Sequence, residues 1–170
     1  MDFKRIVSED REGVALLSKV ATVIVRAFYD PILGTAQNDY MLEKFQSEQA
    51  ISSQIENGYV YYLTLLEEDP IGFFAFYPRA DALYLSKFYL RSDARGKGYG
   101  KGALSFICEQ AVQAGYYAIE LNVNVHNPTI AIYERMGFRR IRSEKIDIGC
   151  GYYMDDYVYR LDIPSFLRTF

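Results

Sequence analysis

The sequence is poor in cysteine and histidine, with two of the former and one of the latter among 170 residues. Cys108 and Cys150 lie far apart, which indicates free thiols in a reducing compartment and argues against a disulfide framework. His126 lies in a predicted loop beside Asn127, where a surface position is favoured over a catalytic role.

Long apolar runs are also missing. No run reaches the ~18 residues that a membrane helix requires, and the first residues lack the hydrophobic stretch of a signal peptide. No linker rich in proline, glycine or serine divides the chain. We therefore expect residues 1–170 to form one domain, located in the cytoplasm and without a membrane partner.

The chain has slightly fewer positive than negative side chains. The chain has 19 Lys and Arg against 22 Asp and Glu, giving a net charge of -3, and its pI is near 5.3. Nucleic-acid binding needs a basic face, so the composition argues against nucleic acid as the main partner. A cationic partner suits this charge balance better.

Residues 83–115 contain the main candidate site: an apolar strand, a glycine-rich turn and an amphipathic helix. Gly96, Gly98 and Gly100 alternate, which lets the backbone approach a ligand and places successive N–H groups on one concave side. The free N–H groups of the following helix favour an anion such as a pyrophosphate. The helix shows a predicted buried stripe of Leu104, Ile107, Cys108, Ala111 and Val112. Fixed positive charge is added by Arg95, Lys97 and Lys101.

Three alternatives to a pyrophosphate cradle fit parts of the turn. A structural turn without a ligand is the simplest of them. A nucleoside-triphosphate loop requires Ser or Thr after Gly-Lys. Here Gly98 follows Gly96 and Lys97, so this alternative is rejected. The dinucleotide fingerprint of oxidoreductases, Gly-x-Gly-x-x-Ala, is met by Gly98, Gly100 and Ala103. However, only about 67 residues follow, too few for the further strand–helix units of that fold.

Two motifs resemble a known family. Arg95, Gly98 and Gly100 form Arg-x-x-Gly-x-Gly, which resembles the pyrophosphate-binding signature of the GNAT superfamily of acetyl-CoA-dependent N-acetyltransferases. About 30 residues downstream, the order Asn, Ala, Tyr, Gly-Phe resembles a second family pattern, with altered spacing. That second motif consists of Asn127, Ala131, Tyr133, Gly137 and Phe138. The resemblance covers residues 59–161.

The resemblance implies an α/β (α+β) fold with helices on both faces of a mixed sheet that is mainly antiparallel around a central parallel strand pair. Hydrophobic patterns predict strands at residues 3–7, 59–66, 71–77, 83–90, 118–123, 138–146 and 155–161. Besides the helix after the glycines, they predict helices at residues 10–28, 40–55 and 127–136, and a loop at 30–38.

The resemblance further implies acetyl-CoA as the co-substrate and no metal. The pyrophosphate would bind the glycine turn, and the pantetheine arm would run between the strand segments 88–90 and 121–123. Asn127 would hold this arm or cap the short helix that follows. The expected cofactor-binding residues are Phe88, Tyr89, Leu90, Arg95, Gly96, Lys97, Gly98, Tyr99, Gly100, Lys101, Asn122, Asn127 and Tyr133.

Acetylation of an amine also requires removal of a proton. An alkyl amine with a pKa near ~10.4 is only about 0.1% neutral at pH 7. Many family members place an acid on the strand before the glycine turn, but residues 83–87 contain none. Glu120 is the residue that we name for this role, with Asp81 and Tyr84 as alternatives. Tyr133 matches the family tyrosine that protonates the departing thiolate.

We therefore predict an N-acetyltransferase that acts by direct attack through a tetrahedral intermediate. The acceptor is a primary amine of a small molecule, such as a polyamine, or of a peptide or protein. Residues 147–159 resemble a bacterial subgroup that includes polyamine N-acetyltransferases, although they also fit a hairpin or the edge of a homodimer. Two alternatives remain: an acyl-CoA-binding regulatory module without turnover, and a dinucleotide-binding oxidoreductase.

Overall fold

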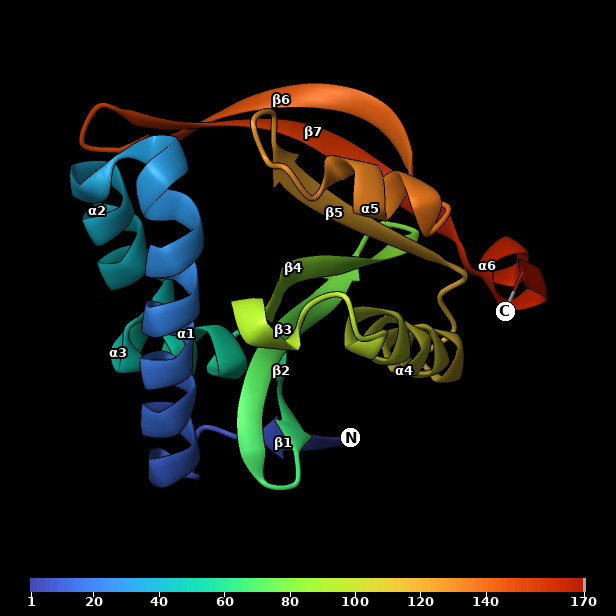
Figure 1. Ribbon diagram of the computed structural model, residues 1–170, viewed down its shortest axis with the longest axis horizontal. Coiled ribbons are helices and arrows are strands. Elements are labelled where there is room, and N and C mark those ends of the chain that lie inside the picture. The colour runs from blue at the N-terminus through green and yellow to red at the C-terminus, as the bar shows by residue number, and fades with distance from the viewer. Residues whose placement is uncertain (170) are drawn as a thin grey trace. The chain divides into compact units, whose positions relative to one another are not determined.

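The computed structural model describes residues 1–169 (Figure 1). Its strands are β1 (Asp2–Ile6), β2 (Val60–Leu66), β3 (Asp69–Arg79), β4 (Ala82–Leu90), β5 (Ala118–Asn124), β6 (Arg139–Gly149) and β7 (Tyr152–Asp162). Its helices are α1 (Arg11–Leu33), α2 (Thr35–Gln46), α3 (Glu48–Glu56), α4 (Tyr99–Gln113), α5 (Ile130–Arg135) and α6 (Ile163–Thr169). A short 3-10 turn, η1, covers Ser92–Ala94.

The strands form one mixed sheet in the order β1-β2-β3-β4-β5-β7-β6. β1, β2 and β3 pair antiparallel, as do β5, β7 and β6. β4 and β5 are parallel, with Leu83 opposite Ile119 and Tyr84 opposite Glu120. Parallel neighbours need a crossover connection, which α4 provides. The predicted sheet with one parallel pair is confirmed, and it differs from the parallel sheet of a dinucleotide-binding fold.

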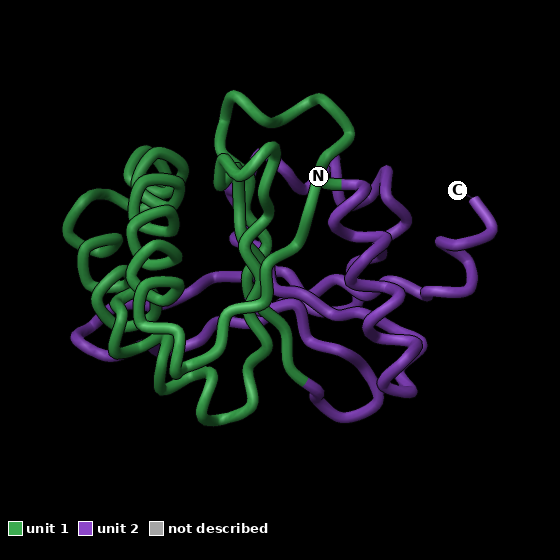
Figure 2. The backbone as a smooth tube through the Cα atoms, turned by 90° about the horizontal axis from the view of Figure 1, so that it is seen from below, with its two compact units in different colours: residues 1–77, 87–100 green, residues 78–86, 101–170 purple. Residues whose placement is uncertain are grey.

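The chain divides into two compact units (Figure 2). The first unit comprises residues 1–77 and 87–100, and the second comprises residues 78–86 and 101–170. The expectation that residues 1–170 form one domain stays a prediction.

The core of the first unit packs α1 against β2 and β3. α1 begins at Asp10, whose side chain accepts a hydrogen bond from the Gly13 N–H at 2.9 Å. The helix buries a stripe of apolar side chains, namely Val14, Leu17, Ala21, Ile24 and Val25. They join the fully buried side chains of Tyr61, Leu63, Phe73 and Ala75. This packing holds α1 on the sheet.

Two sequence predictions in this unit are wrong. α1 passes through Pro31 to Leu33, although we expected a loop from residue 30. A proline in the last turn removes a single helix hydrogen bond, and the packing of α1 outweighs this loss. The helix instead ends before Gly34, which adopts a φ of 82°. The single helix expected at 40–55 is two helices. Ser47 breaks it with extended backbone and caps α3 through a hydrogen bond from the Ala50 N–H at 3.2 Å.

The second unit buries one face of α4. The predicted stripe is confirmed at Leu104, Ile107, Cys108 and Ala111, which are buried, and Ala103 is buried beside them. Val112 is the exception, because it is 37% exposed. β6 and β7 form a long hairpin whose turn contains Cys150 between two glycines with positive φ. Both cysteines are free thiols, as predicted.

Candidate active site

The glycine turn of the first unit has an open surface. Gly96 and Gly98 adopt φ angles of +73° and +85°, in a region that residues with a Cβ rarely adopt. A Cβ built on either glycine meets no atom of the described chain within 4 Å. α4 begins at Tyr99 immediately after the turn, so its first N–H groups have no partner within the helix. The turn can therefore accept an anionic group against bare backbone.

Arg91 fixes the residues before this turn. Its guanidinium lies 2.7 Å from an Asp69 carboxylate oxygen and 2.6 Å from an Asp93 carboxylate oxygen. These bonds lower the pKa of both carboxyls and raise the pKa of Arg91. The Arg91 N–H also donates to the Ile71 carbonyl at 2.8 Å. The start of the turn is thereby tied to β3.

Arg95, the arginine of the predicted signature, is also held in place. Its Nε donates to the Leu90 carbonyl at 3.0 Å, and its guanidinium lies 5.0 Å from the centre of the Phe28 ring on α1. Tyr89 packs against the rings of Tyr29 and Phe73. This contact between Phe28 and Arg95 was not predicted, because α1 and the glycine turn are far apart in sequence.

The second unit carries a polar sheet face. In the ladder of β5 and β7, Glu120 lies opposite Arg160, Asn122 opposite Val158 and Asn124 opposite Asp156. Since alternate residues of a strand share a face, these residues point to the same side of the sheet. We call this side the polar face.

Glu120, our predicted catalytic residue, takes part in an ion-pair network on this face. One carboxylate oxygen lies 2.8 Å from an Arg160 nitrogen and the other lies 3.5 Å from an Arg79 nitrogen. Arg160 also binds Asp81 at 2.8 Å, and Arg79 stacks 3.7 Å from the centre of the Tyr84 ring. Both oxygens of Glu120 are thus already engaged by guanidinium groups, which leaves its assignment as proton acceptor a prediction with little support.

Another pair of carboxyl groups, Glu144 and Asp156, lies farther along the polar face, and we call it the acidic pair. The two residues are directly opposite each other on β6 and β7. The Asn122 amide nitrogen lies 3.1 Å from Glu144 Oε2 and 3.3 Å from Asp156 Oδ2, so one amide group bridges both carboxyls. Asp156 was not among the predicted site residues.

The members of the acidic pair differ in their electrostatics. Burial raises the pKa of Asp156 to about 6, against the smaller effect of the Asn122 hydrogen bond. The Arg142 guanidinium, 2.8 Å from Glu144, instead lowers the pKa of that carboxyl. Two carboxyls whose pKa values are driven apart are typical of sites that handle protons.

The second predicted motif forms a loop and α5. The Asn127 side-chain oxygen accepts hydrogen bonds from the Thr129 N–H at 2.8 Å and from the Thr129 hydroxyl at 2.5 Å. That oxygen therefore fixes the turn before α5, whose N-cap residue is Thr129, and its use in holding the cofactor arm stays a prediction. Tyr133 is half-buried on α5, with its ring edge-on to Phe138 at 5.7 Å between centroids. His126 is exposed, as predicted.

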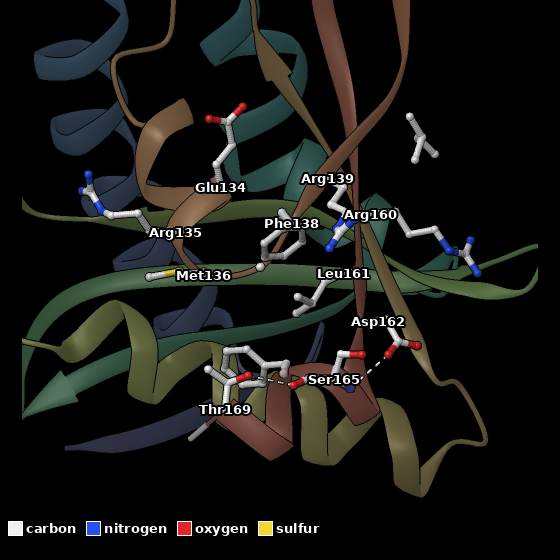
Figure 3. Close-up of a pocket in the computed structure, with 13 residues that line it drawn as sticks. Glu134, Arg135, Met136, Phe138, Arg139, Arg160, Leu161, Asp162, Ser165 and Thr169 are labelled. Carbon is white, nitrogen blue, oxygen red and sulfur yellow. Dashed lines mark hydrogen bonds between the residues drawn. The ribbon is translucent and has the colours of Figure 1, made fainter.

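A pocket of about 580 Å³ lies elsewhere in the second unit (Figure 3). The side chains of Phe138 and Leu161 lie between α5 and α6, and Asp162 accepts a hydrogen bond from the Ser165 N–H at 2.9 Å. None of the residues that we predicted for the cofactor or the catalytic step lines this pocket.

The mixed sheet with its parallel pair and the open glycine turn before α4 fit a protein that binds a phosphate-bearing cofactor. The model of the acetyltransferase (GNAT) family matches residues 24–138, and the chain belongs to this family. It is accordingly an acetyl-CoA-dependent N-acetyltransferase, with acetyl-CoA as co-substrate and an amine as acceptor. Family membership excludes the oxidoreductase alternative.

Solved structures share this fold at low sequence identity. The PaiA N-acetyltransferase from Thermoplasma acidophilum, in complex with coenzyme A, is 19% identical, with a TM-score of 0.75 and coverage of 95% of this chain and 99% of that one. An acetyltransferase from Thermus thermophilus is 20% identical, with a TM-score of 0.66 and coverage of 95% and 96%. The ribosomal-protein-S18-alanine N-acetyltransferase from Escherichia coli is 16% identical, with a TM-score of 0.66 and coverage of 95% and 93%. No curated protein sequence matches the chain.

Metal-binding clusters and membrane-spanning helices are both absent from residues 1–169. No group of His, Cys, Asp and Glu side chains in this part of the chain has an arrangement that could hold a metal ion. Within the same residues, no helix has both the length and the apolar character needed to cross a membrane.

Proposed function

We propose that the protein transfers the acetyl group of acetyl-CoA to a cationic primary amine, either of a small molecule such as a polyamine or of a peptide or protein. The observation that carries this proposal is the acidic pair on the polar face. Its two carboxyls attract an ammonium group. Asn122 Oδ1, which is buried and has no hydrogen-bond partner among residues 1–169, can accept one of the ammonium N–H groups.

The glycine turn supplies the cofactor side of the proposal. Gly96 and Gly98 would leave the backbone open to the pyrophosphate, and the first N–H groups of α4 would stabilise its charge. Fixed charge would come from Arg95, Lys97 and Lys101. Tyr99 and Gly100 begin α4. The pantetheine arm would run along residues 88–90 and 121–123, where strand backbone can bind an extended chain.

In the chemical step, the neutral amine nitrogen attacks the thioester carbonyl carbon. A C–N bond forms, the C–S bond breaks, and the oxyanion of the tetrahedral intermediate is held by a backbone N–H near Phe88 or Tyr89. The departing thiolate takes a proton from the Tyr133 hydroxyl, and the proton that the nitrogen loses as the amide forms restores that hydroxyl. The products are the N-acetylated amine and CoA. Asn127 supports this arrangement by fixing the turn before α5.

The fold alone does not identify the acceptor amine. Among the similar structures, one is an aminoglycoside 6'-acetyltransferase and another is an alanine N-acetyltransferase of a ribosomal protein. We favour a small cationic amine because the β6–β7 hairpin combines carboxylates with tyrosine rings, which can contact ammonium groups.

The experiment is a CoA-release assay with a panel of amines: spermidine, an aminoglycoside, a lysine peptide and a peptide with N-terminal alanine. Release with any of them supports the proposal. Thermal stabilisation by acetyl-CoA, CoA and NAD is measured in parallel, because a ligand at 100 times its Kd adds about 2.7 kcal/mol. Stabilisation by both CoA species without release from any amine would instead favour the regulatory module.

The assembly and location of the protein stay predictions. A homodimer is tested by light scattering. The absence of nucleic-acid and membrane partners is consistent with the net charge of -3, and co-sedimentation with duplex DNA or anionic vesicles tests it. Cell fractionation tests the cytoplasmic location.

A further inference from the structure

The polar face contains two candidate proton acceptors in different environments. Glu120 lies on β5 and Asp156 lies on β7, on the same side of the sheet. Guanidinium groups occupy both oxygens of Glu120. A carboxylate in such bonds would lose two ion pairs if it took a proton. Glu120 is therefore suited to organising the polar face.

Asp156 has the opposite surroundings. It is only 2% exposed, and its recorded hydrogen-bond partner is the neutral Asn122 amide at 3.3 Å. Among residues 1–169, no cationic group is recorded within ion-pair distance of it. The nearby guanidiniums are used elsewhere, since Arg142 binds Glu144 and Arg160 binds Glu120 and Asp81. A buried carboxylate without a cation gains by accepting a proton.

The position of Asp156 connects it to the reacting groups of the proposed function. Among residues 1–169, its one side-chain hydrogen-bond partner is Asn122, which lies on β5 within residues 121–123, the segment expected along the pantetheine arm. Asn122 also contacts Glu144, which keeps 29% of its side chain exposed. The Asn122 amide thus donates to both carboxyls, and Glu144, directly opposite Asp156, connects the acidic pair to solvent.

We propose that Asp156 takes the proton of the acceptor ammonium group and that Glu144 passes this proton to water. This inference rests on the proposed acetyl transfer. The ammonium loses one proton to Asp156 before attack, and the proton leaves through Glu144. The nitrogen loses a second proton when the amide forms, and the CoA thiolate gains one, so one proton is released to water for each turnover.

The charged groups around Asp156 determine its pH dependence. From β6 it faces Glu144, with Arg142 beyond, and from β5 it faces the neutral amides Asn122 and Asn124. On its own strand, Asp155 precedes it, and Arg160 lies four residues further on. Burial is the main cause of the raised pKa of about 6, and the negative charges of Glu144 and Asp155 raise it further. Asp156 is mostly ionised at pH 7.5, and can then accept a proton.

The test is Asp156→Asn, assayed by CoA release with the best amine of the panel. We expect kcat/KM for the amine to fall at least ~100-fold at pH 7.5, as for loss of a general base. The wild-type rate should decrease as the pH is lowered below about 6, and the variant should lack this acid limb of the pH–rate profile. KM for acetyl-CoA should change less than about threefold, because Asp156 is not assigned to the cofactor.

Asp155→Asn is the matched control, because Asp155 is the exposed neighbour on the opposite face of β7. It should keep the rate at pH 7.5 and keep an acid limb, moved to lower pH by less than in Glu144→Gln, because the Asp155 charge raises the pKa of Asp156 less than the Glu144 charge does. Glu144→Gln, on the exposed edge strand β6, is a second variant that tests the inference. Removing the Glu144 charge should move the acid limb to lower pH, because that charge raises the pKa of Asp156.

The outcomes separate the inference from the proposed function. If the wild-type protein releases no CoA with any amine, the proposed function itself is wrong. If the wild type is active and Asp156→Asn keeps its rate, or loses rate but keeps the acid limb, Asp156 is not the proton acceptor. If Asp156→Asn does not fold, Glu144→Gln decides, and an unmoved acid limb overturns the inference.

Discussion

Lys87 of β4 is a buried lysine whose effect on stability can be measured. It is 6% exposed, and its ammonium group donates hydrogen bonds to the Phe45 carbonyl at 2.6 Å and to Gln54 Oε1 at 2.8 Å. It also donates to the Tyr61 hydroxyl, which in turn donates to Gln54 at 2.6 Å. Among the described residues, no carboxylate is recorded as its partner. Burial therefore lowers the pKa of Lys87 from 10.5 to about 7.

This lowered pKa predicts that stability increases with pH. Between about pH 7 and 10.5, the lysine is protonated in the unfolded chain but largely neutral in the folded one. The unfolded state then binds more protons, so the free energy of unfolding rises as pH rises, by up to about 1.4 kcal/mol per pH unit. Over the whole interval the effect is on the order of 5 kcal/mol. Below pH 7 both states are protonated and the full penalty remains.

The assay is urea unfolding followed by circular dichroism, since the chain has no tryptophan. Between pH 7.5 and 8.5, the free energy of unfolding of the wild type should rise by about 1 kcal/mol more than that of Lys87→Met. Cys108, whose pKa burial raises from 9.0 to about 12, opposes this rise as the thiol of the unfolded chain ionises, but it does so equally in the wild type and in Lys87→Met. Lys19→Met, a substitution of an exposed lysine on α1, should keep the wild-type slope.

The slope of stability against pH is the decisive quantity, because Lys87→Met also changes packing and removes one of the two donors to each of the Gln54 Oε1 and Phe45 carbonyl oxygens. Those effects shift stability equally at all pH values in this window. Equal slopes for the wild type and Lys87→Met would show that Lys87 is not a buried amine that loses its proton in the folded protein.

Three further predictions concern the site and the thiols. Gly98→Val should weaken acetyl-CoA binding about tenfold by calorimetry, because its φ of +85° is strained for valine; Gly115→Val, at the same φ after α4, should leave binding unchanged. Tyr133→Phe should lower kcat by 10- to 100-fold, roughly, without changing stabilisation by CoA, and an unchanged kcat would remove Tyr133 from the mechanism. A thiol reagent should modify one cysteine of the native protein, the exposed Cys150, and also Cys108 after unfolding; two fast thiols in the native state would contradict the burial of Cys108.

Local pattern was enough to predict much of the fold. The spacing of apolar residues predicted α4 and its buried stripe, and the glycines at alternate positions predicted an open turn at its start. These features depend on residues close together in sequence. The same approach missed the break at Ser47 and the passage of α1 through Pro31, where packing and capping decide between similar local energies.

The sequence by itself determined the family, the cofactor class and the glycine turn, because each rests on a contiguous motif. Only the tertiary structure distinguished the surroundings of the two carboxyls proposed for proton transfer. Glu120 and Asp156 are both acids on predicted strands, and nothing local tells them apart. The register of β5, β6 and β7 gives Arg160 to Glu120 and a neutral amide to Asp156, and Arg79 at the end of β3 adds a second arginine to Glu120. These partners come from residues 34 or more positions away, so the difference arises only when the sheet assembles.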